Sequence, residues 1–180
     1  MTASMTKVWP PANITAPAIY VGDDKSPENI TSEDNISGVL NVAYEINDKT
    51  TPPHGVPKFQ YAKVGMIDGL NPNTRDVLLA AVLMVEQLAA FPPDQHGFPR
   101  GANLLIHCEA GHSRSVTVAA LYIWYKYCSG GKHHKHFPDF THVYNMVEQA
   151  RGDHKPSQGM QDGAMALVKS FSQLFPLKMS

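Results

Sequence analysis

The sequence predicts an α/β fold in which helices cover a central β-sheet. Short apolar runs of strand length, bounded by Gly, Pro or polar residues, occur four times before residue 108. Stripes of apolar residues with helical spacing lie between the later runs and then follow one another to the C-terminus. Strands that alternate with helices, followed by a run of helices, favour an α/β sheet covered on its faces.

The four apolar runs are expected to form strands. The run at Tyr61–Met66 alternates, which is typical of a strand with one buried face. A compact run such as Asn103–His107 is typical of a buried strand, and we expect at least two of the four to be buried. The four predicted strands are Ala18–Val21, Gly38–Ala43, Tyr61–Met66 and Asn103–His107.

Four stretches are expected to form helices. The first begins at a cap, Thr74 or Asn73, and ends before Pro92 and Pro93. The stretch Arg114–Tyr127 is apolar almost all round, which predicts a helix buried in the core. The apolar stripes of the other helices are Leu78, Ala81, Val82, Val85, Leu88 and Ala89, then Val143, Met146, Val147 and Ala150, then Met160, Ala164, Leu167, Val168, Phe171, Leu174 and Phe175.

The whole chain, 1–180, is expected to be a single domain with an irregular N-terminal tail over 1–17. Its 43% hydrophobic and 17% charged residues are typical of globular proteins. The formal net charge of −1 points to no nucleic-acid or membrane partner, and no apolar run reaches the ~20 residues of a membrane span. Two cysteines make no disulfide framework, so we expect a reducing, cytoplasmic location.

Two long loops are expected, at 91–101 and 129–138. The second contains His133, His134 and His136, and imidazole is a common metal ligand. These histidines are too close together in the sequence for a well-formed site, so a solvated loop without metal is the favoured interpretation.

The most informative segment is Asn103–Ser115, N-L-L-I-H-C-E-A-G-H-S-R-S. An apolar strand runs into a turn of small residues, and a helix begins at once. The free N–H groups of the helix's first turn and the helix dipole therefore favour a bound anion. Gly111 permits a close backbone approach or a positive φ, and Arg114 supplies a planar charged fork that suits two phosphate oxygens. This segment predicts a site for a phosphate dianion or a sulfate.

Cys108 stands at the entrance to this loop. Its thiol is expected to ionise readily, because the loop N–H groups and Arg114 stabilise a thiolate. His107 is expected to fix the loop, and Ser115 or Ser113 to donate a hydroxyl to the sulfur. The predicted chemistry has two steps: Cys108 displaces an alcohol or phenol from phosphate, and water then hydrolyses the thiophosphate. A buried, inert cysteine is the alternative, but the match extends well beyond a chance C-x5-R.

His107–Ser115 resembles the signature H-C-x2-G-x-S-R-S of the dual-specificity branch of the cysteine-dependent protein tyrosine phosphatase superfamily. The resemblance extends to Ala18–Gly22 and Gly38–Ala43, which are similar to the family's first two strands, and to Arg151–Met160, which is similar to the turn before its last helix. It implies a tyrosine-phosphatase-like fold with a central, mostly parallel sheet of about four or five strands flanked by helices on both sides. It also implies that neither a metal nor an organic cofactor takes part.

The resemblance also implies a set of site residues. The catalytic residues it implies are Cys108, Arg114, Asp68, Ser115 and His107. The phosphate-binding residues it implies are Glu109, Ala110, Gly111, His112, Ser113 and Arg114.

Protonation of the leaving group needs an acid on the opposite side of the phosphate. The family has an Asp in a loop after the strand that precedes the long helix, and Asp68 matches this place. Asp76 and Asp94 are the rivals. Asp76 falls in the first turn of a predicted helix, where it suits the helix N-terminus, and Asp94 falls in the loop 91–101.

The phosphate loop carries Glu109 and no Lys or second Arg between Cys108 and Arg114, so it favours singly phosphorylated substrates. We expect phosphotyrosine on a protein partner, with phosphoserine and phosphothreonine as further substrates, and a monomeric enzyme. The alternatives are a pseudophosphatase that only binds phosphate, a phosphatase for lipid or RNA phosphates, and an arsenate reductase or sulfurtransferase. Arsenate reduction needs a second reactive cysteine, and Cys128 is expected to lie ~20 Å from Cys108 along a helix.

Overall fold

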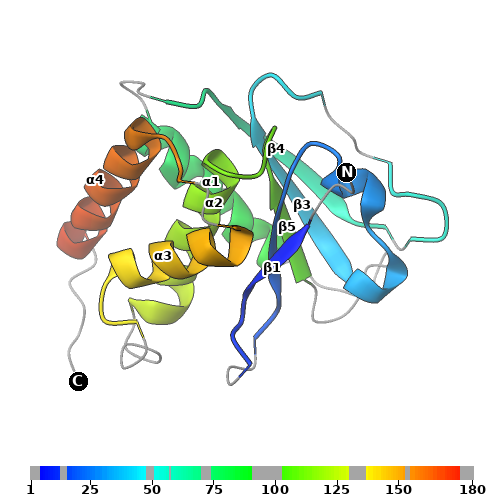
Figure 1. Cartoon of the computed structure of the whole chain (residues 1–180), viewed down its shortest axis with the longest axis horizontal. Helices are drawn as coiled ribbons and strands as arrows, with labels where there is room; N and C mark the ends of the chain where they lie inside the picture. Colours follow the sequence, from blue (N-terminus) through cyan, green and yellow to red (C-terminus); the bar gives the residue numbers. More distant parts are fainter. Residues whose placement is uncertain are drawn as a thin grey trace.

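A computed structural model describes residues 5–12, 16–47, 51–56, 58–69, 74–90, 103–129, 137–152 and 155–174. Its centre is a five-stranded sheet of order β1-β2-β5-β3-β4 (Figure 1). All neighbouring strands are parallel except β1, which pairs antiparallel with β2 at the edge. The strands are β1 Thr6–Trp9, β2 Ile19–Gly22, β3 Ile36–Ala43, β4 Gln60–Met66 and β5 Asn103–His107. The predicted α/β class with a mostly parallel sheet is confirmed, and the four predicted strands are present.

The N-terminal segment corrects one expectation, because residues 1–17 are not irregular throughout. They contain β1, whose side chains Val8 and Trp9 are 5% and 0% exposed. The Trp9 ring stacks on Tyr127, with ring centroids 5.1 Å apart. Four residues are too few for a strand's alternation to be recognised, and the strand is stabilised by a ring that is distant in the sequence.

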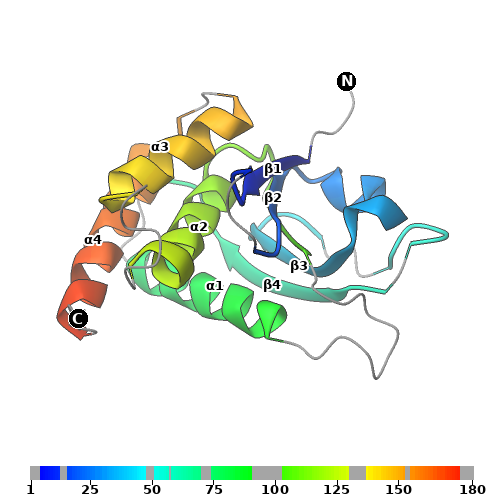
Figure 2. The ribbon, with the colours of Figure 1, turned by 90° about the horizontal axis from the view of Figure 1, so that it is seen from below.

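The two faces of the sheet carry separate apolar clusters. Leu104 of β5 belongs to the larger cluster, which includes buried side chains from all four α-helices. The next residue, Leu105, points into a smaller cluster that is closed by Ile30. Ile30 lies between two 3₁₀ turns, Ser26–Asn29 and Ser32–Asp34. The four α-helices therefore cover one face, and short 3₁₀ turns take their place on the other (Figure 2). This corrects the expectation of helices on both sides of the sheet.

The four α-helices appear in the predicted order. They are α1 Thr74–Ala89, α2 Arg114–Ile123, α3 Phe140–Arg151 and α4 Gln158–Leu174. Every residue of α2 is buried, as its apolar sequence predicts. It continues as a π-helix, Trp124–Cys128. Cys128 is a free thiol there, and burial raises its pKa to about 12, so it stays protonated near neutral pH.

Some expectations concern segments outside the described residues. These are the loop 91–101 with Asp94, and most of the loop 129–138 with its three histidines. Within the described part of the chain, no group of three or more His, Cys, Asp or Glu side chains is arranged to hold a metal ion. None of the described helices combines the length and the apolar content that crossing a bilayer requires.

Candidate active site

The loop between β5 and α2 depends on Gly111. Its φ is +73°, a conformation that side chains other than glycine rarely adopt. A Cβ at this position would lie 2.7 Å from Arg151 Nη2 and 2.8 Å from the carbonyl oxygen of Gly22. The loop backbone therefore approaches β2 too closely for any other residue. The N–H of Cys108 also donates to the Gly22 carbonyl, at 3.3 Å.

Arg151, the last residue of α3, braces this loop. Its Nε donates to the Gly111 carbonyl at 3.0 Å, and its Nη1 donates to Thr6 Oγ1 at 3.2 Å. The residue is buried, and burial lowers the pKa of the guanidinium. No local pattern in the sequence indicates this contact, because Arg151 lies 40 positions from Gly111.

Replacing Gly111 with alanine is expected to distort the loop. The positive φ costs about 1–2 kcal/mol, and the contacts below 3 Å require Arg151 or the Gly22 backbone to move. We expect a lower melting temperature and loss of the stabilisation that tungstate gives, both measured by thermal unfolding. Gly55→Ala is the matched control, because Gly55 also has a positive φ, +82°, but nothing lies within 4 Å of the added Cβ. Equal losses in the two variants would contradict the packing argument.

Cys108 and Ser115 lie together at the two ends of the loop. The Cys108 Sγ and the Ser115 Oγ are 3.2 Å apart, within hydrogen-bonding distance for sulfur. Both residues are buried, with 2% and 0% exposure. Ser113, the other candidate for this contact, instead donates its hydroxyl to Asp68. Of the two serines that the sequence left as alternatives, the structure therefore places Ser115 at the sulfur and Ser113 at Asp68.

Arg114 is the first residue of α2 and is 3% exposed. Its guanidinium forms a two-pronged ion pair with Glu45: Nη1 donates to Oε2 at 2.7 Å, and Nη2 lies 2.5 Å from Oε1. Nη1 also donates to the Met66 carbonyl at 3.0 Å. Burial alone would lower the pKa of Arg114, but the hydrogen bond to Glu45 and the charge of Cys108 outweigh it, so the pKa is raised. The hydrogen bond from Arg114 lowers the pKa of Glu45.

The third donor of Arg114, its Nε, is buried, and no described residue accepts a hydrogen bond from it. A buried donor of this kind is stabilised when a ligand oxygen becomes its acceptor. Glu45 therefore holds the guanidinium in place through Nη1 and Nη2 and does not occupy Nε. No pattern in the sequence indicates Glu45, which lies two residues beyond β3 and 69 positions from Arg114.

Asp68 lies two residues beyond β4, and its carboxylate reaches the loop. Its Oδ1 accepts from the hydroxyl of Ser113 at 2.7 Å and from the hydroxyl of Ser157 at 2.8 Å. The N–H of Ser157 donates to the Ser113 hydroxyl at 3.0 Å. This network joins the predicted acid to the phosphate loop and to the turn before α4. The rival Asp76 lies on α1 instead, where Arg75 Nε is 3.0 Å from its Oδ1.

The remaining predicted residues differ in exposure. His107 is fully buried at the end of β5, with its ring centroid 6.4 Å from that of Tyr61. Glu109 and Ala110 are exposed, and His112 is half-buried. Glu109 Oε2 lies 3.6 Å from Nη2 of the catalytic candidate Arg114. The predicted contribution of these residues to phosphate binding stays a prediction.

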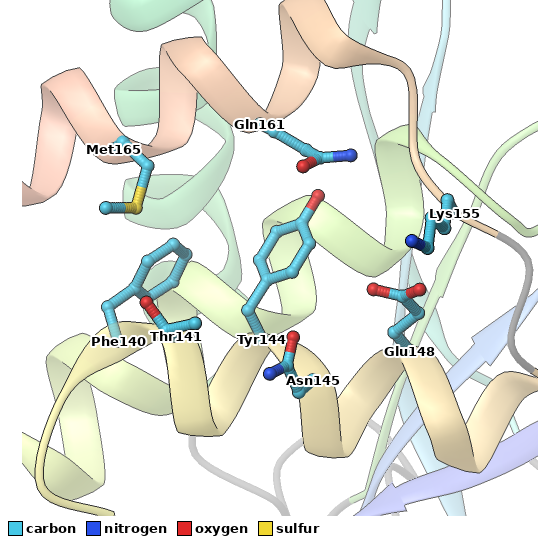
Figure 3. A pocket seen from close by; sticks show the side chains of 8 residues that line it. All are labelled: Phe140, Thr141, Tyr144, Asn145, Glu148, Lys155, Gln161 and Met165. Carbon is cyan, nitrogen blue, oxygen red and sulfur yellow. The ribbon is translucent and has the colours of Figure 1, made fainter.

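A cavity of about 220 Å³ lies between α3 and α4 (Figure 3). None of the residues that line it is a predicted catalytic residue. Tyr144 and Gln161 project into it from the two helices. The Tyr144 hydroxyl lies 3.1 Å from Thr117 Oγ1 of α2, and Gln161 Nε2 donates to the Pro156 carbonyl at 2.8 Å. The cavity therefore adjoins the turn that carries Ser157, beside the phosphate loop.

The fold has counterparts of known structure, although no family model matches the chain and no curated protein matches its sequence. A mouse protein assigned as a dual specificity phosphatase, crystallised with zinc tungstate, is similar with a TM-score of 0.69 at 16% identity, over 98% of this chain and 93% of that chain. Human DUSP28 gives 0.65 at 16% identity, over 93% and 95%. The Yvh1 phosphatase domain from Chaetomium thermophilum gives 0.65 at 16% identity, over 93% and 96%. The chain has the tyrosine-phosphatase-like fold. The predicted resemblance to dual-specificity phosphatases is confirmed as a likeness of fold.

Proposed function

We propose that this protein is a cysteine-dependent phosphatase of the dual-specificity branch, which hydrolyses phosphate monoesters on proteins. One observation carries the proposal: the nucleophile candidate Cys108, the guanidinium of Arg114 and the carboxylate of Asp68 all converge on one loop. The loop follows a parallel strand and precedes a buried helix, a setting that favours bound anions. The fold shared with dual-specificity phosphatases supports the same reading.

In the first proposed step, the Cys108 thiolate attacks the phosphorus atom while Arg114 and the loop N–H groups hold the phosphate oxygens. An S–P bond forms, and the bond from phosphorus to the leaving oxygen breaks. Asp68 transfers its proton to that oxygen, so that an alcohol or phenol leaves. Two hydroxyls already bind Asp68 Oδ1, and this leaves Oδ2 to carry the proton.

In the second proposed step, water attacks phosphorus, the S–P bond of the phosphocysteine breaks, and its electron pair returns to sulfur. Asp68, now ionised, accepts a proton from the attacking water. The Ser115 hydroxyl, 3.2 Å from Sγ, donates to the departing thiolate. Both steps use side chains and water alone, so we expect no requirement for a metal or an organic cofactor.

The charge around the loop supports a singly phosphorylated substrate. Glu109 is exposed, and Glu45 remains 42% exposed despite its pairing with Arg114. These carboxylates disfavour ligands with several phosphates, each of which adds roughly −1.5 to −2 charges. We therefore propose phosphotyrosine on a protein as the substrate, with phosphoserine and phosphothreonine as further substrates.

The arsenate-reductase alternative would need a second reactive thiol near Cys108. Cys128 lies at the far end of the helical segment that begins at Arg114. The rise of an α-helix places it roughly 20 Å from the loop, and burial raises its pKa to about 12. Cys128 is therefore unsuited to be the second thiol.

A phosphate-release screen tests the proposal. The purified protein, with EDTA present, is given matched phosphotyrosine, phosphoserine and phosphothreonine peptides, a phosphoinositide and a 5′-phosphorylated RNA. We expect phosphate release from the phosphopeptides, fastest from phosphotyrosine. Peptide binding without any release would identify a pseudophosphatase. Faster turnover of the lipid or the RNA would reassign the substrate while keeping the thiol chemistry.

A further inference from the structure

Two large apolar side chains are exposed next to the candidate active site. Tyr44 is 70% exposed and Ile67 is 60% exposed. In the described part of the chain, Leu83 and Met165 are the other large hydrophobic side chains with comparable exposure. Scattered exposed side chains need no explanation, but Tyr44 and Ile67 lie together on neighbouring strand ends.

The backbone connects these two residues directly to the catalytic candidates. The N–H of Tyr44 donates to the Met66 carbonyl at 3.2 Å, and the same carbonyl accepts from Nη1 of Arg114 at 3.0 Å. Tyr44 immediately precedes Glu45, which pairs with Arg114, and Ile67 immediately precedes Asp68. We call Tyr44 and Ile67 the rim pair. Each member of the rim pair is therefore the chain neighbour of a residue that contacts Arg114 or Ser113.

The turn that carries Tyr44 is held in place before any ligand binds. The strand β3 has a register shift between Asn41 and Ala43. Asn41 is fully buried, and its side chain accepts from the Ala43 N–H at 2.9 Å and donates to the Ile46 carbonyl at 3.2 Å. Lys63 Nζ donates to the same carbonyl at 2.6 Å. A surface ordered in advance loses little conformational entropy on binding.

We propose that the rim pair binds a bulky apolar side chain adjacent to the phosphorylated residue of a protein substrate, an inference that rests on the proposed phosphatase function. Tyr44 and Ile67 adjoin Glu45 and Asp68 in the chain, so residues that flank a phosphate bound at Arg114 would lie within reach of the rim pair. Contact there removes apolar surface of both partners from water.

The charges at the rim select the kind of partner. The carboxylates of Glu45 and Glu109 are exposed beside Arg114, at 2.5 and 3.6 Å from its Nη2. They disfavour acidic residues beside the phosphate, and they equally disfavour an anionic lipid surface. Lys63 of β4 is directed to the Ile46 carbonyl, to which its Nζ donates. The partner that fits both the apolar rim pair and the carboxylates around it is therefore a peptide with an uncharged, apolar residue next to the phosphorylated one.

The test compares phosphotyrosine peptides that carry Leu, Ala or Glu at each position next to the phosphotyrosine. We expect the wild-type protein to prefer Leu over Ala at one or more of these positions by about fivefold in kcat/KM, as partial burial of a Leu side chain predicts. In the double variant Tyr44→Ser with Ile67→Ser, KM for the Leu peptide should rise until the preference disappears, with kcat on that peptide retained. Leu83→Ser is the matched control, because Leu83 is 54% exposed on α1, and it should retain the preference.

The outcomes that overturn the proposal are distinct from failure of the proposed function. The wild-type protein could hydrolyse nitrophenyl phosphate and yet show no preference for Leu over Ala in the peptides. That result, or a Leu preference that survives in the double variant, would overturn the rim-pair proposal alone. If phosphoinositide vesicles were turned over faster than the peptides, and only with the rim pair intact, the rim pair would bind a lipid surface. That result would also overturn the rim-pair proposal. Absence of turnover on every substrate, nitrophenyl phosphate included, would overturn both proposals.

Discussion

The Cys108→Ser variant is expected to release no measurable phosphate, a loss in kcat on the order of 10⁴-fold or more. A serine hydroxyl is almost entirely protonated near neutral pH, and the loop donors that stabilise a thiolate do not make it an effective nucleophile. The substitution replaces one atom and leaves Arg114, Asp68 and the Gly111 backbone in place. The variant should therefore still bind an oxyanion.

Two measurements check this prediction. Phosphate release at saturating phosphotyrosine peptide measures turnover, and the rise in melting temperature on adding tungstate measures oxyanion binding. Cys128→Ala is the matched control, because Cys128 is also a buried free thiol but has no role in the proposed chemistry. This variant should keep its activity wherever it remains folded. Turnover by Cys108→Ser in metal-free buffer, comparable to that of the wild-type protein, would disprove the thiol mechanism.

The second large effect is expected for Asp68→Asn. Loss of a general acid slows the reaction by about 10²–10⁴-fold when the leaving group needs a proton. A serine alkoxide is a far poorer leaving group than nitrophenolate, so turnover of a phosphoserine peptide should fall much more than turnover of nitrophenyl phosphate. Asparagine keeps an oxygen that accepts from the hydroxyls of Ser113 and Ser157. The variant therefore removes the proton while preserving the network.

Asp76→Asn is the control for this prediction. Asp76 is exposed on α1 and pairs with the neighbouring Arg75, at 3.0 Å. Its substitution should change neither rate. If Asp68→Asn slowed both substrates by the same factor, Asp68 would act in binding or in positioning the loop, and the acid would have to be sought elsewhere.

The residue spacing within Asn103–Ser115 was enough to predict the local backbone on which Cys108 and Arg114 lie. Strand, turn and helix follow each other without interruption there, and Cys108 and Arg114 are separated by only one tight turn. Gly111 was expected to permit a close backbone approach or a positive φ, and the structure has both. Asp68 was inferred from the resemblance to a known family, because its distance from the loop is not encoded locally.

The sequence did not predict β1. The segment Thr6–Trp9 shows too few alternations to be recognised, and no two-residue hairpin turn such as Asn-Gly joins it to β2. Its burial comes from Trp9 packing on Tyr127, which only the folded chain brings near. The same limit applies to the rim pair, because the sequence does not show that Tyr44 and Ile67 remain exposed.

By itself, the sequence determined the fold class and the local geometry of the phosphate loop, because hydrophobic periodicity and turn chemistry act over a few residues. The tertiary structure decided which distant groups complete the site. Contacts of Arg151 with Gly111, Glu45 with Arg114 and Ser157 with Asp68 join positions 40, 69 and 89 apart. They exist because the sheet places β5 between β2 and β3, with β4 beyond β3. Parallel strands end at one edge, and the order of the strands along that edge follows from packing of the whole core.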